Sequence, residues 1–289
     1  MTTLSWSSFM KKVLISAFIF AAGIAAFAFD DSPFMKPNGS PKSYTQTEFT
    51  ITTKFGDYFR TPATKYKHTF NDDGLEIESA EYSVAGQLAT KIVYEYTSDK
   101  QIASQACYDA EGNLFWKVSA VFDKNGKRTE ENEYDSKGAL VGKTIYKYDG
   151  PNSVDETYYN SQGDLIWKNT YTYNSEKKLA ESCSYFANGS LDVKKIYVYN
   201  SDGSLSEIDS YNHLNEQVAR EVNVYNPEGL LSEYAVYGSD GKRRSRIFYK
   251  YDDKKNVVKK TTYNIAQKFG NTVNEMVGQS DFSYEFANQ

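Results

Sequence analysis

The stretch Tyr134-Asp-Ser-Lys-Gly-Ala-Leu140 decides the fold, because the chain repeats its pattern of an aromatic residue, usually Asp or Asn, two variable residues and usually Gly. Sixteen copies lie between Phe70 and Gln267. They open with Phe70, Tyr82, Tyr96, Tyr108, Phe122, Tyr134, Tyr148, Tyr159, Tyr173, Tyr185, Tyr199, Tyr211, Tyr225, Tyr237, Tyr251 and Tyr263. The spacing alternates between 12 and 14 residues, with one step of 11 after Tyr148, so the repeat is about 26 residues long. This period predicts an architecture in which each unit packs against its neighbours.

The residues between these phrases favour β-strands. Thr144, Ile145 and Tyr146 are of types enriched in strands, and the apolar residues show no helical spacing. The phrase itself has turn chemistry, because Asp or Asn hydrogen-bonds the backbone two residues on and Gly adopts a positive φ. We therefore expect strands of about eight and ten residues, joined by short hairpin loops.

Some turns lack Gly at its usual position. Asn152 and Asn215 should replace it most easily, because Asn tolerates the left-handed conformation next best. Lys100, Lys177 and Lys255 should adopt that conformation at a greater cost.

Two columns of charge predict how the strands pair. A base lies five residues after the Gly position in each longer strand, at Lys91, Lys117, Lys143, Lys168, Lys194, Arg220 and Arg246. Four residues before the Tyr of the shorter strands lie Glu78, Ser104, Glu130, Asp155, Glu181, Glu207 and Glu233. If Tyr82 pairs with Gln87, and equivalent residues likewise, six hairpins place opposite charges directly across, each contributing about 0.2–1 kcal/mol. A rival register pairs each turn Tyr with the Leu two residues beyond the Gly.

The pattern predicts a thin sheet. One face of the longer strands carries Leu, Trp, Ile, Val and Tyr, the shorter strands add small polar residues, and neither face is purely apolar. Tyrosine suits such a half-buried surface, because it has an apolar ring and a polar hydroxyl. We expect an all-β fold: an elongated antiparallel meander of tandem hairpins, as a single-layer or curled open sheet. About fifteen strands would extend roughly 70 Å.

The ends depart from the repeat, which divides the chain into four segments. Lys11 and Lys12, an apolar run over 13–28 and the closing Ala-Phe-Ala predict that residues 1–28 form a secretory signal peptide, with an uncleaved anchor as the alternative. Residues 29–65 are expected to form a leader and N-terminal cap, 66–267 the tandem hairpin repeats, and 268–289 a C-terminal cap. No stable membrane span is expected after signal cleavage.

Charge and cysteine content limit the possible partners. Cleavage would change the net charge from −5 to −7, because it removes two lysines. This mild, evenly spread acidity argues against nucleic acid as a partner. Cys107 and Cys183 lie six strands apart, far beyond the ~7 Å that a disulfide spans, so we expect two small, partly buried thiols.

Four of the phrases resemble a known repeat family. Tyr108-Asp-x-x-Gly-x-Leu114, Tyr134-Asp-x-x-Gly-x-Leu140, Tyr159-Asn-x-x-Gly-x-Leu165 and Tyr199-Asn-x-x-Gly-x-Leu205 resemble the bacterial tyrosine-aspartate repeats of the Rhs type. The chain is more weakly similar to the MORN-like repeats of YwqK-type proteins. The resemblance covers about residues 66–267 and implies a β-rich surface or envelope protein, without assigning any functional residue.

We expect no enzyme activity, cofactor or metal site. The only histidines are His68 and His213, and His213 lies inside a predicted turn. A catalytic or metal site would need partners gathered from distant repeats, and no motif indicates one.

The aromatic residues are the one candidate for a binding site. Trp116 and Trp167 occupy equivalent places in repeats two units apart, with Tyr146, Tyr171 and Tyr197 in neighbouring columns. If exposed, these flat faces could stack on sugar rings. If buried, they form the packing between repeats.

These observations leave three functional hypotheses. The first is an exported, non-catalytic β-repeat scaffold of the bacterial envelope or surface that contacts another protein. The second is a glycan-binding or cell-wall-binding module that uses the aromatic face. The third, based on the likeness to YwqK-type proteins, is a toxin-neutralising or immunity-type protein.

Overall fold

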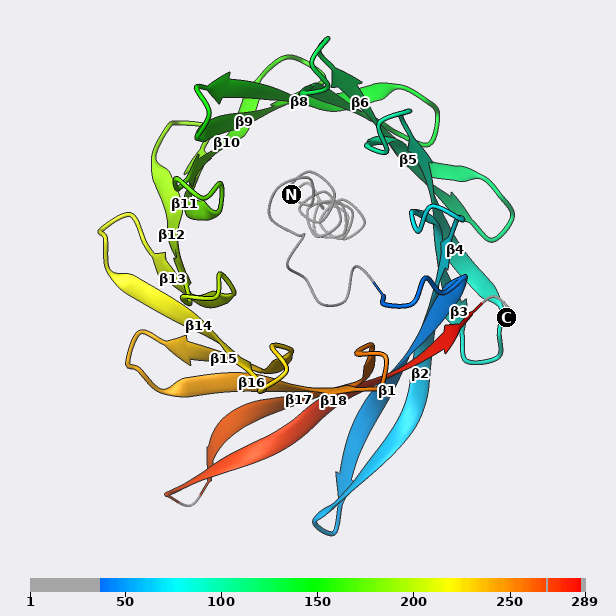
Figure 1. The fold of residues 1–289 in the computed structure, drawn as a ribbon, viewed down its shortest axis with the longest axis vertical. Helices are drawn as coiled ribbons and strands as arrows, with labels where there is room; N and C mark the ends of the chain where they lie inside the picture. Colours follow the sequence, from blue (N-terminus) through cyan, green and yellow to red (C-terminus); the bar gives the residue numbers. More distant parts are fainter. Residues whose placement is uncertain (1–36, 269, 287–289) are drawn as a thin grey trace, which may run out of the picture.

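The fold is a closed β-barrel in a computed structural model that describes residues 37–268 and 270–286. The strands are β1 (Ser43–Lys54), β2 (Asp57–Phe70), β3 (Glu76–Ser83), β4 (Leu88–Tyr96), β5 (Ile102–Asp109), β6 (Leu114–Phe122), β7 (Arg128–Tyr134), β8 (Leu140–Asp149), β9 (Ser153–Asn160), β10 (Leu165–Tyr173), β11 (Leu179–Phe186), β12 (Leu191–Tyr199), β13 (Leu205–Tyr211), β14 (Gln217–Tyr225), β15 (Leu231–Gly238), β16 (Arg243–Tyr251), β17 (Val257–Lys268) and β18 (Asn271–Glu285). Each strand pairs antiparallel with the next (Figure 1). Within the described ranges, no helix has the length and apolar character of a membrane span.

The all-β meander is as expected, but the open, elongated sheet is wrong. β18 pairs with β1 over eight residues, from Ser43↔Glu285 to Thr50↔Gly278, and this pairing closes the ring seen in Figure 1. The reason is that the two end segments, instead of covering separate sheet edges, supply complementary edges to each other and leave no free edge along this seam. The predicted signal peptide, residues 1–28, lies outside the described residues.

The turns have the chemistry that the repeated phrase predicts. Asp135 Oδ1 accepts hydrogen bonds from the backbone N–H groups of Lys137 (2.8 Å) and Ala139 (2.9 Å), and Gly138 has φ +76°. The left-handed conformation is also found at four of the five residues expected to replace Gly: Lys100, Lys177, Asn215 and Lys255.

Two predicted turns differ. Asn152 was expected to replace Gly, but in that shortened turn Gly150 takes the positive φ (+65°). The sixteenth phrase, which begins at Tyr263, forms no turn, because β17 continues through it to Lys268. Its sequence Asn-Ile-Ala-Gln has no Gly to reverse the chain.

The register is the rival one. Tyr82 pairs with Leu88, not Gln87, so the predicted register is wrong. The shift has two causes. The turn is one residue longer than predicted, because Ser83 N–H bonds to Gln87 C=O and Tyr82 then pairs with Leu88. Ala89 forms a β-bulge without a partner, so the next pair is Glu81 with Thr90. The same irregularity recurs beside other turn aromatics, such as Tyr108, Tyr134 and Tyr225, but not beside Tyr148 at the shortened turn.

The charge ladder nevertheless forms, because long side chains reach across the diagonal between strands. The ion pairs are Lys91–Glu78 (3.3 Å), Lys143–Glu130 (4.0 Å), Lys168–Asp155 (2.7 Å), Arg220–Glu207 (3.9 Å) and Arg246–Glu233 (3.1 Å). The base of the remaining predicted pair, Lys194, instead binds Asn215 Oδ1 at 2.7 Å and lies over the Tyr211 ring. The exposed members of this ladder contribute little stability each.

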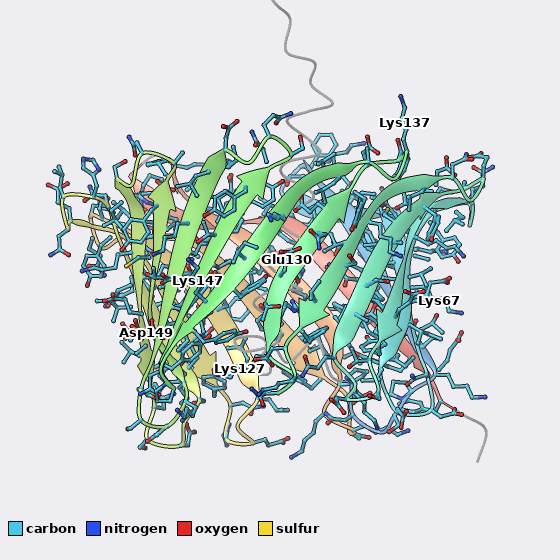
Figure 2. All side chains as sticks on the ribbon, turned by 90° about the horizontal axis from the view of Figure 1, so that it is seen from above. Lys67, Lys127, Glu130, Lys137, Lys147 and Asp149 are labelled. Carbon is cyan, nitrogen blue, oxygen red and sulfur yellow. The ribbon has the colours of Figure 1, made fainter. Side chains whose placement is uncertain are left out.

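The ladder faces outward. Figure 2 views the barrel wall from outside and shows Glu130 and Lys147 on its outer side. Because side chains alternate along a strand, their neighbours Glu131 and Tyr146 point into the barrel. A ring of 18 strands has a radius of roughly 18 Å at the usual strand tilt, so the inner side chains line a lumen.

The two cysteines lie on opposite sides of this wall. Cys107 pairs with Ile92 and Trp116 on the inner face, and Cys183 pairs with Lys194 on the outer face. Both are buried free thiols, and burial raises the pKa of Cys107 to about 11.

In five of the longer strands, the tyrosine at the end of the strand bonds to the neighbouring strand. Its hydroxyl donates to the backbone carbonyl 20 residues earlier, at the start of the preceding shorter strand. The pairs are Tyr96–Glu76 (2.6 Å), Tyr148–Arg128 (2.9 Å), Tyr199–Leu179 (2.8 Å), Tyr225–Leu205 (2.8 Å) and Tyr251–Leu231 (2.7 Å). Burial raises the pKa of Tyr96 and of Tyr251 to about 12, so these hydroxyls stay protonated donors at neutral pH. In these five repeats the motif tyrosine therefore ties the turn that it opens to the preceding shorter strand.

We predict that Tyr199→Phe lowers the free energy of unfolding by about 0.5–1.5 kcal/mol, because it removes one hydrogen bond and keeps the ring. Phe122 occupies the equivalent position naturally, so the ring fits there without a hydroxyl. Urea denaturation followed by circular dichroism measures the change. Tyr211→Phe, on the outer face, is the control and should stay within about 0.5 kcal/mol of the unmodified protein. Equal stability of both variants would contradict this role.

Candidate functional site

All five aromatic residues proposed for ligand stacking lie on the inner face. Trp116 comes from β6, Tyr146 from β8, Trp167 and Tyr171 from β10, and Tyr197 from β12. Tyr146 and Tyr171 are 9% and 8% exposed, whereas both Trp residues and Tyr197 are partly buried. The structure brings Tyr146 and Tyr171 together around one carboxylate, while Trp116 lies four strands from Trp167.

That carboxylate is Glu156 on β9, which is 5% exposed. Its Oε2 accepts hydrogen bonds from Tyr171 Oη (2.7 Å) and Asn169 Nδ2 (3.0 Å). Its Oε1 accepts from Tyr146 Oη at 3.3 Å, and Tyr146 also lies 2.9 Å from Glu131 Oε2. The hydroxyl of Tyr146 thus lies between two buried carboxylates.

Glu131 is balanced by a buried base. Arg128 Nη1 lies 2.5 Å from Glu131 Oε1, and the two side chains are 8% and 6% exposed. Removing one partner of such a pair leaves a buried charge, which costs more than an exposed pair would lose.

The absence of a side chain at Gly142 makes room for the ring of Tyr158, the next residue of the cluster. A Cβ at Gly142 would lie 2.2 Å from the hydroxyl of Tyr158, so only Gly fits beneath that ring. Tyr158 donates to Glu133 Oε2 at 2.8 Å and stacks on Trp167, with ring centroids 5.4 Å apart and an interplanar angle of 9°. Gly142 occupies the repeat position that Trp116 and Trp167 hold elsewhere.

We define the lumen cluster as Arg128, Glu131, Glu133, Tyr146, Glu156, Tyr158, Trp167, Asn169 and Tyr171. Burial raises the pKa of Glu156, and hydrogen bonds from Asn169 and Tyr171 partly offset that shift. Burial also raises the pKa of Glu133, against the opposing hydrogen bond from Tyr158. Burial, and then the charges of Glu131 and Glu156, hold the pKa of Tyr146 far above its usual range.

A smaller copy of this chemistry lies farther along the ring, on β12, β14 and β15. Tyr234 donates to Glu221 Oε2 at 2.7 Å, and Lys195 Nζ lies 3.6 Å from Glu221 Oε1. Tyr197 hydrogen-bonds Ser182 at 3.2 Å on the wall between the two clusters. Tyrosine–carboxylate bonding therefore recurs around the lumen.

Sequence reasoning missed the carboxylates of the lumen cluster. The corresponding inner positions of β11 hold Ser182 and Ser184, whereas Glu131, Glu133 and Glu156 occupy them in β7 and β9. The replacement of small polar residues by glutamates at these positions was the sequence feature from which the cluster could have been predicted. Among residues 37–268 and 270–286, no group of three or more His, Cys, Asp or Glu side chains has metal-binding geometry.

The cluster can bind protons and polar ligands. Its carboxylates accept hydrogen bonds from Tyr, Asn and Arg, and its Trp167–Tyr158 stack presents a partly buried aromatic surface beside them. Aromatic faces next to hydrogen-bonding groups can hold a ligand that is both flat and polar.

No family model matches the chain, and no curated protein matches it. Similar solved structures include a porin-like protein from Bacteroides uniformis, with 10% identity over 86% of this chain and 99% of that one and a TM-score of 0.47. They also include a TcdB2–TccC3 complex (12% identity, 78% of this chain and 16% of that one, TM-score 0.27). A DUF3836 family protein from Bacteroides vulgatus is 21% identical over 31% of this chain and 90% of its own, with a TM-score of 0.20.

We predict that Glu156 makes the protein more stable as the pH falls from 7 towards 4.5, the ordinary pKa of the glutamate side chain. Its native pKa lies above the ordinary value of 4.5, so the folded state holds this proton more tightly than the unfolded chain does. Stability therefore decreases as the pH rises through the window between those two values. Glu156→Gln should flatten this dependence in urea titrations at a series of pH values.

The matched control is Glu111→Gln in the exposed turn after β5, which should keep the pH dependence of the unmodified protein. A Glu156→Gln variant with an unchanged slope between pH 7 and 4.5 would contradict the account of this carboxyl.

Proposed function

We propose that the protein is an exported, non-catalytic β-repeat scaffold of the bacterial envelope or surface, which works by contact with another protein. One observation supports this most directly: acidic side chains on both faces of the wall bond to neighbouring residues of the sheet, so their role is structural. The outer acids pair with Lys and Arg of the ladder, and the inner acids accept hydrogen bonds from tyrosines.

In this proposal, the partner protein binds the outer face of the barrel wall. This face exposes apolar side chains opposite acids of the ladder: Val121 (45%), Val198 (42%) and Val224 (46%) pair with Glu130, Glu207 and Glu233. A rigid array that repeats the same exposed positions suits an extended binding surface. Export rests on the predicted signal peptide, residues 1–28.

A glycan-binding module is the second candidate, and the Trp167–Tyr158 stack favours it. Its rings are parallel, face the lumen and adjoin Glu133, an arrangement that suits a sugar with an apolar face and polar edges. Retention of the protein on cell-wall polysaccharide, lost in Trp167→Ala, would favour this candidate. The toxin-neutralising hypothesis stays a prediction.

Two residues of β6 on opposite sides of the wall give a matched test. Val121 points outward, opposite Glu130 of the ladder, and Trp116 points inward, opposite Cys107. We predict that a photo-crosslinking phenylalanine analogue at position 121 captures a protein in living cells, and that the same analogue at 116 does not. Gel mobility and mass spectrometry read out the adducts.

Cell fractionation of the same cultures should place the mature chain outside the cytoplasm. Recovery only in the cytoplasm would overturn the export proposal. Protein adducts at 116 and none at 121 would overturn the outer-wall scaffold.

A further inference from the structure

The two ends of the barrel differ in exposed apolar side chains. We call the end that carries the turn between β1 and β2 the β1–β2 rim; the turns after each later odd-numbered strand lie there too. Its exposed large apolar residues are Phe55, Tyr58, Phe59, Val84, Phe115, Leu140, Val141, Ile166, Phe186, Leu214 and Val218. Near the opposite rim the comparable residues are Ile77, Val121, Val198 and Val224. One end of the barrel is therefore the more apolar.

The most exposed of these residues has an unfavourable backbone conformation. Lys54 pairs with Asp57, so β1 and β2 are joined by the two-residue turn Phe55-Gly56, with φ values of +53° and +89°. A turn with two positive φ values favours Asn-Gly, and a bulky residue in the first position is an outlier. Phe55 is 105% exposed, so packing within the chain does not explain it.

This hairpin extends beyond the barrel wall. β1 pairs with β18 only as far as Thr50, and β2 pairs with β3 only from Thr64, so residues 51–63 lie outside the closed ring (Figure 1). The projecting part is held in place, because Arg60 Nη1 lies 2.6 Å from Asp281 Oδ2 and the Tyr58 hydroxyl lies 3.3 Å from Asn274 O. The aromatic tip is thus presented by a fixed hairpin.

We propose that the β1–β2 rim docks on a phospholipid bilayer, with the Phe55 ring inserted into the interface and Tyr58 and Phe59 at the level of the headgroups. An exposed ring at a turn gains free energy by leaving water, and aromatic residues concentrate at membrane interfaces. Exposed Lys54 and Asp57 face each other across the turn, so the tip carries no net charge that would oppose its approach to a lipid surface. Binding at the interface requires no strand to cross the membrane.

A bilayer fits this surface better than a folded protein partner does. The tip is narrow and convex, whereas a stable protein interface buries about 800 Å² on each partner. A lipid surface is continuous, so it can receive the tip and the apolar residues along the rim together. The proposal is independent of the scaffold function, because the test uses purified protein and lipid alone.

The test measures binding of the purified protein to vesicles of phosphatidylcholine, alone or mixed with phosphatidylglycerol, by co-sedimentation. The unmodified protein should bind both, because the inserted ring and not a charge drives the binding. Phe55→Asn should lower the partition coefficient on the order of tenfold or more, because it removes the inserted ring. The same variant should keep or raise the melting temperature, since Asn suits the turn.

The matched control is Val121→Thr with Val224→Thr, which removes exposed apolar groups from the opposite rim and should leave partitioning unchanged. Failure of the unmodified protein to bind vesicles, or equal binding by Phe55→Asn, would overturn the proposal. Concentration-dependent dimers that Phe55→Asn abolishes, without vesicle binding, would assign the rim to a second copy of the chain and also overturn it.

Discussion

The ladder of backbone hydrogen bonds that runs around the barrel is the constraint on which the other features depend. Every strand of the repeat pairs with both neighbours, and the seam between β1 and β18 completes the ring. The wall is a single sheet, so it has no deep apolar core: the largest side chains that are fully buried are Val257, Thr144 and Ser280. Closure replaces that core as the way to satisfy the edges, because a ring has no unpaired strand along its seam.

The tyrosines follow from this constraint. A single-layer wall buries each side chain only partly, so a ring that covers backbone and a hydroxyl that finds an acceptor are both useful. The motif tyrosines bond to carbonyls at strand starts, and Tyr146, Tyr158, Tyr171 and Tyr234 bond to inner carboxylates. The repeated phrase therefore encodes the turn and the link between adjacent strands together.

Local chemistry was predictable from the sequence because it depends on residues close together in the chain. The Asp135–Gly138 turn and the lysines with positive φ follow from short-range conformational preferences. The register was not, since the longer turn and the bulged residue Ala89 each shift the pairing by one residue, which composition does not reveal. Closure was also missed, because the pairing of Ser43 with Glu285 depends on the curvature summed over the whole ring.

The candidate site was likewise predictable only in part. Trp116 and Trp167 could be identified by their repeat position, yet their shared inner face became clear only once the side of the wall was known. The lumen cluster depends on Gly142, whose absent side chain admits Tyr158. A single Gly in a strand predicts close approach of another group without saying which one.

Closure of the ring can be tested directly at the seam between β1 and β18. Thr45 and Ser283 face each other across the seam. Cysteines placed there, in a chain with Cys107 and Cys183 replaced by serine, should form an intramolecular disulfide under mild oxidation, because paired residues of adjacent strands lie within the required distance. Near-complete bond formation in the monomer, detected by mass spectrometry, is the predicted result. Two free thiols, or bonds only between separate chains, would contradict closure of the barrel.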